Sequence, residues 1–92
     1  MHELSIAQAV VDGIVEQMHG ARVTGVRLEI GAQSGVLPDA IEFCFPVICE
    51  GTPLEGAWLE IVQPPGPHLR VTGVEIPRRA GSIDGAAAKE AV

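Results

Sequence analysis

The first three residues, Met1-His2-Glu3, carry donor atoms from which a metal site could be assembled. The amine of Met1, the amide nitrogen of His2 and the His2 imidazole Nδ1 can bind one ion together. The amine and amide close a five-membered chelate ring, and the amide and imidazole close a six-membered one. A second deprotonated amide, that of Glu3, could complete a square of nitrogens. Such nitrogen-rich, roughly planar sites suit Ni(II) or Cu(II).

Metal binding at this terminus should depend steeply on pH. The ion must displace protons from the amine, whose pKa in a free chain is about 7.7–8.0, and from the amides. We expect Met1 to be retained, because removal of the initiator generally needs a small second residue and His2 is bulky. Alternatively the terminus has no role, since any chain that begins Met-His has these atoms. The helix predicted directly after it would tether this one.

The other candidate side chains form no comparable set. Cys44 and Cys49 are five residues apart and fall on different faces of a helix, so packing is favoured over metal ligation. His19 is interpreted as a charge at a helix end. His68 is interpreted as an exposed loop residue with at most a weak accessory metal contact, and Arg78-Arg79 as a solvated pair. No catalytic triad or carboxylate pair is evident, so the chain is not predicted to be an enzyme.

Apolar residues recur at helical spacing between Leu4 and Met18. A capping-box pattern places the start of this helix at Ser5, and Gly20 is a plausible stop. Pro38 suits the first turn of a second helix, which should end at Glu50-Gly51.

Ile41, Cys44, Phe45 and Ile48 would form the buried face of the second helix. Pro46, which lies inside the pattern, should kink or shorten it.

Three segments are predicted to be strands: Arg22–Ile30, Trp58–Val62 and Leu69–Ile76, the last with a possible bulge at Thr72-Gly73. The order of elements predicts an α+β domain with two helices packed on one face of a three-stranded mixed sheet. Because the Pro- and Gly-rich turn at residues 63–68 is too short for a crossover, the last two strands are expected to pair as an antiparallel hairpin. The domain should span residues 1–76, and residues 77–92 should form a flexible C-terminal tail.

The net charge of the chain argues against some classes of partner. The 92 residues include twelve acidic and six basic side chains, which give a net charge of −6. Nucleic acid and anionic membrane surfaces are therefore not expected as partners, because both require a basic face. No apolar run reaches the roughly 20 residues needed to span a bilayer, and no secretory signal is recognisable, so a cytoplasmic location is expected.

Several segments together resemble the HypA/HybF family. They are Met1-His2-Glu3-Leu4-Ser5, 19–24 (HGARVT), 26–32 (VRLEIGA), 43–45 (FCF), 50–52 (EGT), 54–57 (LEGA) and the closing strand 69–76. They cover roughly residues 1 to 76, in the family's order and spacing.

The resemblance implies a nickel metallochaperone for the large subunit of [NiFe]-hydrogenase that works with the GTPase HypB; some members also serve urease. It further implies that Met1, His2 and Glu3 are the nickel ligands and that the Glu3 side chain contacts the partner protein. The alternative is a protein-interaction module of the maturation machinery that no longer binds metal.

The sequence departs from the family pattern at two places. The family normally inserts a zinc domain with two Cys-x-x-Cys pairs between the last two strands, where this chain has only residues 63–68. No structural zinc is therefore expected, and properties that depend on the zinc domain are in doubt. Many relatives also carry a carboxylate just before the second helix, whereas this chain has Leu37-Pro38 with Asp39 shifted, which puts an auxiliary oxygen ligand in doubt.

Overall fold

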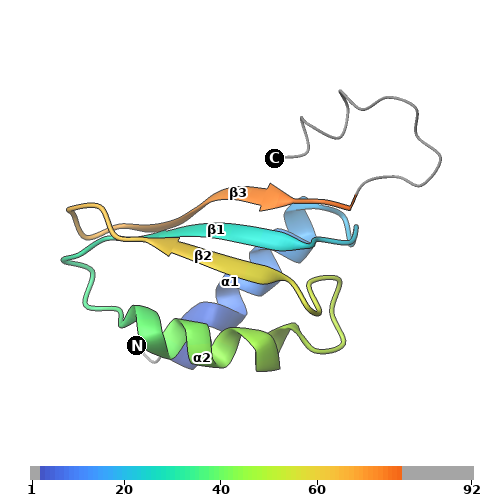
Figure 1. Cartoon of the computed structure of the whole chain (residues 1–92), viewed down its shortest axis with the longest axis horizontal. Coiled ribbons are helices and arrows are strands. Elements are labelled where there is room, and N and C mark those ends of the chain that lie inside the picture. The colour runs from blue at the N-terminus through green and yellow to red at the C-terminus, as the bar shows by residue number, and fades with distance from the viewer. Residues whose placement is uncertain (1–2, 78–92) are drawn as a thin grey trace.

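The computed structural model describes residues 3–77. They form helices α1 (Glu3–Gln17) and α2 (Pro38–Cys49) and strands β1 (Gly25–Ile30), β2 (Trp58–Val62) and β3 (Leu69–Glu75). Both helices lie on one side of a three-stranded mixed sheet (Figure 1). The predicted α+β architecture is therefore confirmed. Met1, His2 and, apart from Pro77, the predicted tail at residues 77–92 lie outside the described residues.

Helix α1 begins at Glu3, two residues before the predicted start at Ser5. The predicted capping box does not form, because the Gln8 side chain donates a hydrogen bond to Asp12 (2.9 Å) instead of reaching back toward Ser5. An acidic residue in the first turn suits the positive end of the helix dipole. At the other end, Gly20 adopts a φ of 77° and its N–H donates to the carbonyl of Val15 (2.9 Å), which confirms it as the stop.

Helix α2 begins at Pro38, as predicted, and continues past Pro46 to Cys49. Of the two expected effects of Pro46, a kink or a shorter helix, shortening does not occur. Pro46 lies on the exposed side of α2, where water can bond to the carbonyl that lacks a helical donor. The helix ends at the predicted place, and Gly51 takes a positive φ of 75° just beyond it.

The strand order is β2-β1-β3, so the predicted hairpin between the last two strands is wrong. Strand β1 pairs in parallel with β2 and antiparallel with β3. The connection β1–α2–β2 is a crossover through a helix, which is the usual way to place two parallel strands side by side. Strand β1 is therefore the central strand. The link 63–68 crosses the end of β1 to join β2 to β3, which lie two strand positions, or about 10 Å, apart.

The link 63–68 is held against the loop that follows β1. The N–H groups of Gly31 and Ala32 donate to the carbonyls of His68 (2.7 Å) and Pro64 (2.8 Å). Gly31 is required here, because a Cβ atom at this position would overlap the carbonyl of Gly66. The link 63–68 is thus a connection held by backbone hydrogen bonds.

The core between the helices and the sheet is aliphatic apart from Phe45 and Cys49. Its fully buried side chains come from α1, β1, α2 and the loops on either side of β1 and α2: Ala7, Val11, Val23, Val26, Leu28, Ile30, Ile41, Phe45, Cys49 and Leu54. No buried polar side chain is found among residues 3–77. The pairing of β1 with β3 shifts register opposite Thr72, which confirms the predicted bulge.

Candidate functional site

Glu3 is the one predicted metal-site residue that lies within the described chain. It is the first residue of α1 and is partly buried. The N–H groups of the first helical turn are not part of the helical hydrogen-bond ladder. Binding of a metal by the Glu3 amide, the predicted fourth nitrogen ligand, would therefore break no bond of that ladder.

The Glu3 side chain joins the starts of the two helices. Its Oε2 accepts a hydrogen bond from the N–H of Leu37 (3.2 Å), the residue that precedes α2. Leu37 has no polar side chain with which to cap this helix, so Glu3 supplies from α1 a carboxylate that satisfies a donor at the N-terminus of α2. This bond links residues 34 positions apart and fixes the first turn of α1 against α2.

Leu37, where the sequence put an auxiliary oxygen ligand in doubt, has an exposed side chain. Asp39 lies in the first turn of α2 and is also exposed. No group of three or more His, Cys, Asp or Glu side chains that could hold a metal ion occurs in residues 3–77.

The two cysteines behave as packing residues. Cys49 is buried in the core, and burial raises the pKa of its thiol to about 11. Metal ligation requires the thiolate, so this shift disfavours it. Cys44 is half-buried and packs against the core cluster formed by Ala7, Leu28, Ile30 and Ile41. These placements agree with the predicted preference for packing over ligation.

His68 lies in the loop before β3, as predicted, but it is only partly exposed and its side chain has a partner. Its Nε2 lies 3.1 Å from Oε1 of Glu29 on β1, and Arg70 Nε donates to the same oxygen at 3.1 Å. The hydrogen bond from His68 is the main cause that holds the pKa of the Glu29 carboxyl below its ordinary value; burial opposes this shift and Arg70 adds to it. His68 therefore ties the link 63–68 to the outer face of the sheet.

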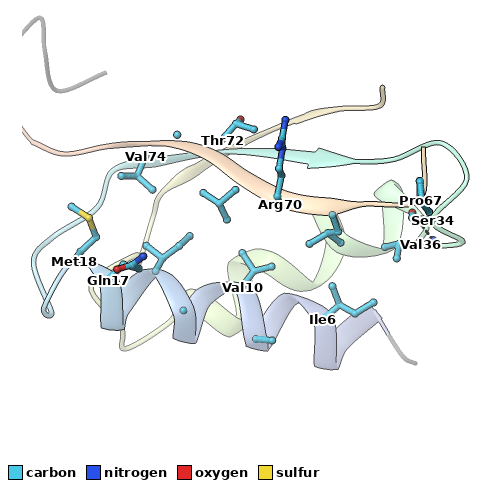
Figure 2. A pocket seen from close by; sticks show the side chains of 16 residues that line it. Ile6, Val10, Gln17, Met18, Ser34, Val36, Pro67, Arg70, Thr72 and Val74 are labelled. Carbon is cyan, nitrogen blue, oxygen red and sulfur yellow. Dashed lines mark hydrogen bonds between the residues drawn. The ribbon is translucent and has the colours of Figure 1, made fainter. Parts of the chain in front are cut away.

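An open groove of about 790 Å³ separates α1 from β3 (Figure 2). Ile6 and Val36 line one end, and Met18 and Val74 line the other. Its walls are mostly aliphatic and include no carboxylate, thiol or imidazole. Its lining suits an apolar ligand or side chain.

None of the helices within residues 3–77 combines the length and the apolar character needed to cross a membrane.

Comparison with known proteins identifies the relatives of this chain. A family model described as "Hydrogenase/urease nickel incorporation, metallochaperone, hypA" matches residues 1–69. The hydrogenase maturation factor HypA of Trichormus variabilis is 52% identical over 77 residues, which cover 83% of this chain and 68% of the relative. The HypA proteins of Nostoc punctiforme and Geobacter metallireducens are 52% and 54% identical over 66 residues, 72% of this chain.

The matched segments make up 58% of the length of the Nostoc relative and 60% of that of the Geobacter relative, so the chain spans roughly two thirds or less of these proteins. The family match nevertheless begins at residue 1 and runs through α1, β1, α2 and β2 into the start of β3. This chain belongs to the HypA family, whose description is hydrogenase and urease nickel incorporation.

Proposed function

We propose that this chain is a nickel carrier that binds one Ni(II) through the Met1 amine, the His2 amide and imidazole and the Glu3 amide, and delivers it for [NiFe]-hydrogenase maturation. The observation that carries the proposal is the family match that begins at residue 1 and so includes all three donor residues. Nickel is the cargo here, and the chain acts as a carrier rather than a catalyst.

The start of α1 supports this ligand set. Glu3 lies in the first described turn of α1, so use of its amide as a ligand leaves the helical ladder intact. The positive end of the helix dipole favours an ionised amide at this position. The bond from Leu37 to the Glu3 carboxylate restricts the first turn and so reduces the entropy that is lost when the ligands gather round the ion.

We propose a HypB-like GTPase and the hydrogenase large subunit as the protein partners, in the cytoplasm, with Glu3 at the contact. Nucleic acid and membranes are not proposed as partners, in keeping with the net charge of −6. A structural zinc is not proposed either, because the whole chain has two cysteines, one of them buried in the core, and the short link 63–68 stands at the insertion point.

A nickel titration of the protein with a native, untagged N-terminus tests this function. One nickel should bind per chain, with the yellow, diamagnetic spectrum of a square-planar complex above neutral pH. His2→Ala, and a chain extended by residues before Met1, should each weaken binding by more than the roughly 10–100-fold typical of losing a group that only orients a ligand. His68→Ala is the matched control, since His68 is bound to Glu29. Nickel affinity that is unchanged in both altered termini would overturn the assignment.

The alternative function, an interaction module that no longer binds metal, is favoured by one observation. The side chain of Phe43 on α2 is 82% exposed, which is unusual for so large an apolar residue. Partner binding that tolerates His2→Ala, in a protein that also fails the nickel titration, would support this alternative over the carrier.

A further inference from the structure

A stripe of apolar residues runs along the outer side of α2. Ala40, Phe43 and Val47 of α2 follow one another at intervals of three or four residues and so share one side of the helix. Together with Leu37, the exposed residue just before α2, they are here called the outer ridge. The side chains of Leu37, Phe43 and Val47 are 62%, 82% and 63% exposed. The ridge is about 15 Å long, since each helical residue rises 1.5 Å.

The outer ridge is not needed to bury the core. The opposite side of α2 already presents Ile41, Phe45 and Cys49 to the interior, each at most 2% exposed. Leaving a Phe and a Val in water forgoes roughly 1.5–3 kcal/mol of burial for each side chain. An exposed apolar stripe of this kind is typical of a surface that another molecule covers.

The charges around the ridge have one sign. The two helices carry five acidic residues, Glu3, Asp12, Glu16, Asp39 and Glu42, and no Lys or Arg. Asp39 and Glu42 border the ridge within α2, and the ion pairs found among residues 3–77 do not include either of them. Apolar side chains set among acidic ones complement a partner whose apolar residues are flanked by basic ones.

The ridge begins at the proposed nickel terminus. Its first residue, Leu37, donates its N–H to the carboxylate of Glu3, the first residue of α1. In Figure 1 the start of α2 lies beside the start of α1, so a molecule seated on the ridge would reach the first described turn of α1.

We propose that the outer ridge is a docking surface for a basic amphipathic helix of a partner protein. The three-to-four-residue spacing of the ridge matches the spacing of apolar residues on one face of a helix, which allows the two helices to pack side by side. Lys or Arg residues that flank the partner's apolar stripe would face Asp39 and Glu42. This proposal rests on the proposed function in one respect: the purpose of the surface is to hold the partner beside the proposed nickel site.

Two other occupants fit less well. A second copy would bring the acidic helices of two chains, each with a net charge of −6, against one another. Residues 78–92 begin with Arg78-Arg79 but contain only Ile83 and Val92 as larger aliphatic residues, too few to cover a Phe and a Val.

The test uses the full chain, labelled with ¹⁵N, and a synthetic leucine–lysine amphipathic helix of about five turns as the probe. A leucine–glutamate peptide of the same apolar pattern is the control probe. We expect the lysine peptide to shift amide signals along the outer ridge and at Asp39 and Glu42, with an affinity that falls as salt rises. Phe43→Ser combined with Val47→Ser should weaken binding by about tenfold or more. Val62→Ser, an exposed residue of β2, should leave binding unchanged.

Each other result would overturn the proposal. Equal affinity for the glutamate peptide, or shifts confined to the groove between α1 and β3, would show that the ridge does not select a basic helix. Self-association that the Phe43→Ser change abolishes would assign the ridge to a second copy. Lysine-peptide binding that appears only after deletion of residues 78–92 would assign it to the chain's own C-terminal segment. None of these readouts involves nickel, so failure here and failure of the nickel titration are distinguishable.

Discussion

The outer face of the sheet and the outer ridge of α2 are both exposed to solvent, but among residues 3–77 the side-chain ion pairs all lie on the sheet face. On the sheet face, Arg27 on β1 binds Glu60 on β2 (2.9 Å), and Glu29 on β1 binds Arg70 on β3 and His68 just before it. On the ridge, apolar side chains lie among carboxylates that form no ion pair in the described chain.

Side chains at the start of the sheet also bond to one another across its outer face. The indole of Trp58 on β2 lies over Gly25 on β1, and its Nε1 donates to the carboxylate of Glu75 on β3 (2.8 Å). One side chain therefore spans all three strands. The sheet face thus serves the fold, whereas the ridge leaves apolar area and charge for another molecule.

The largest expected contrast lies between two phenylalanines of α2. Phe45→Ala should lower the free energy of unfolding by about 3–5 kcal/mol, because Phe45 is 2% exposed and its removal leaves a cavity in the core. Phe43→Ala should change it by no more than about 0.5 kcal/mol, because Phe43 is 82% exposed. Urea unfolding followed by the fluorescence of Trp58, the single tryptophan, gives both values.

A loss above about 1 kcal/mol for Phe43→Ala would break the comparison. It would mean that the outer ridge contributes to the fold and is not reserved for a partner.

These two residues also show how far the sequence predicts the fold. Helical periodicity assigned Ile41 and Phe45 to the buried face and left Phe43 out, and the structure confirms this. The positions of helices and strands follow from such local patterns. Strand pairing does not: the shortness of the link 63–68 favoured a hairpin, but β1 instead lies between β2 and β3. The competing signal was the helix between β1 and β2, which places those two strands in parallel.

The candidate site was predictable only in part. The donor atoms of Met1-His2-Glu3 follow from residue types and order, and their role in nickel binding stays a prediction. The bond between Glu3 and Leu37 could not be predicted, because it joins residues 34 positions apart through the packing of α1 on α2. The same holds for His68, whose contact with Glu29 depends on the strand order.

The second prediction concerns the contact of Trp58 with Gly25 and Glu75 at the start of the sheet. Gly25→Ala places a methyl group where the Trp58 indole lies, so the ring must move and its bond to Glu75 is lost. We expect a loss of about 1–3 kcal/mol and a red-shifted Trp58 emission. Gly13→Ala is the matched control: no atom lies near its added methyl, and it should stabilise α1 by up to about 1 kcal/mol. Equal stabilities for the two variants would show that the Trp58 indole does not pack over Gly25 as described.

The third prediction uses pH to test the bond between Glu29 and His68. Because the folded pKa of Glu29 lies below its ordinary value of 4.5, its contribution to stability is present above that value and is lost as pH falls through the folded pKa. Glu29→Gln should therefore be less stable than the natural chain at pH 7, and the difference should shrink below about pH 4.5. Thermal unfolding between pH 7 and pH 3 measures this. The same difference at every pH would exclude an ionic origin, and Glu50→Gln, outside the ion pairs of residues 3–77, should show no such trend.

The fourth prediction concerns the smallest change in stability. The same substitution, Glu to Gln, should destabilise the protein on the sheet face but not on the outer ridge. Glu60→Gln removes an ion pair with Arg27 in which both side chains are about half exposed, so the protein should lose about 0.2–1 kcal/mol. Glu42→Gln removes one of two carboxylates three residues apart on α2, so it should be neutral or stabilise by a few tenths of a kcal/mol. Both effects should fade in 1 M salt, where charges at this distance are screened. The denaturant midpoints of the two variants at low and high salt measure both changes in stability. If Glu42→Gln destabilised the protein, the acidic residues beside the ridge would already have a partner within the chain.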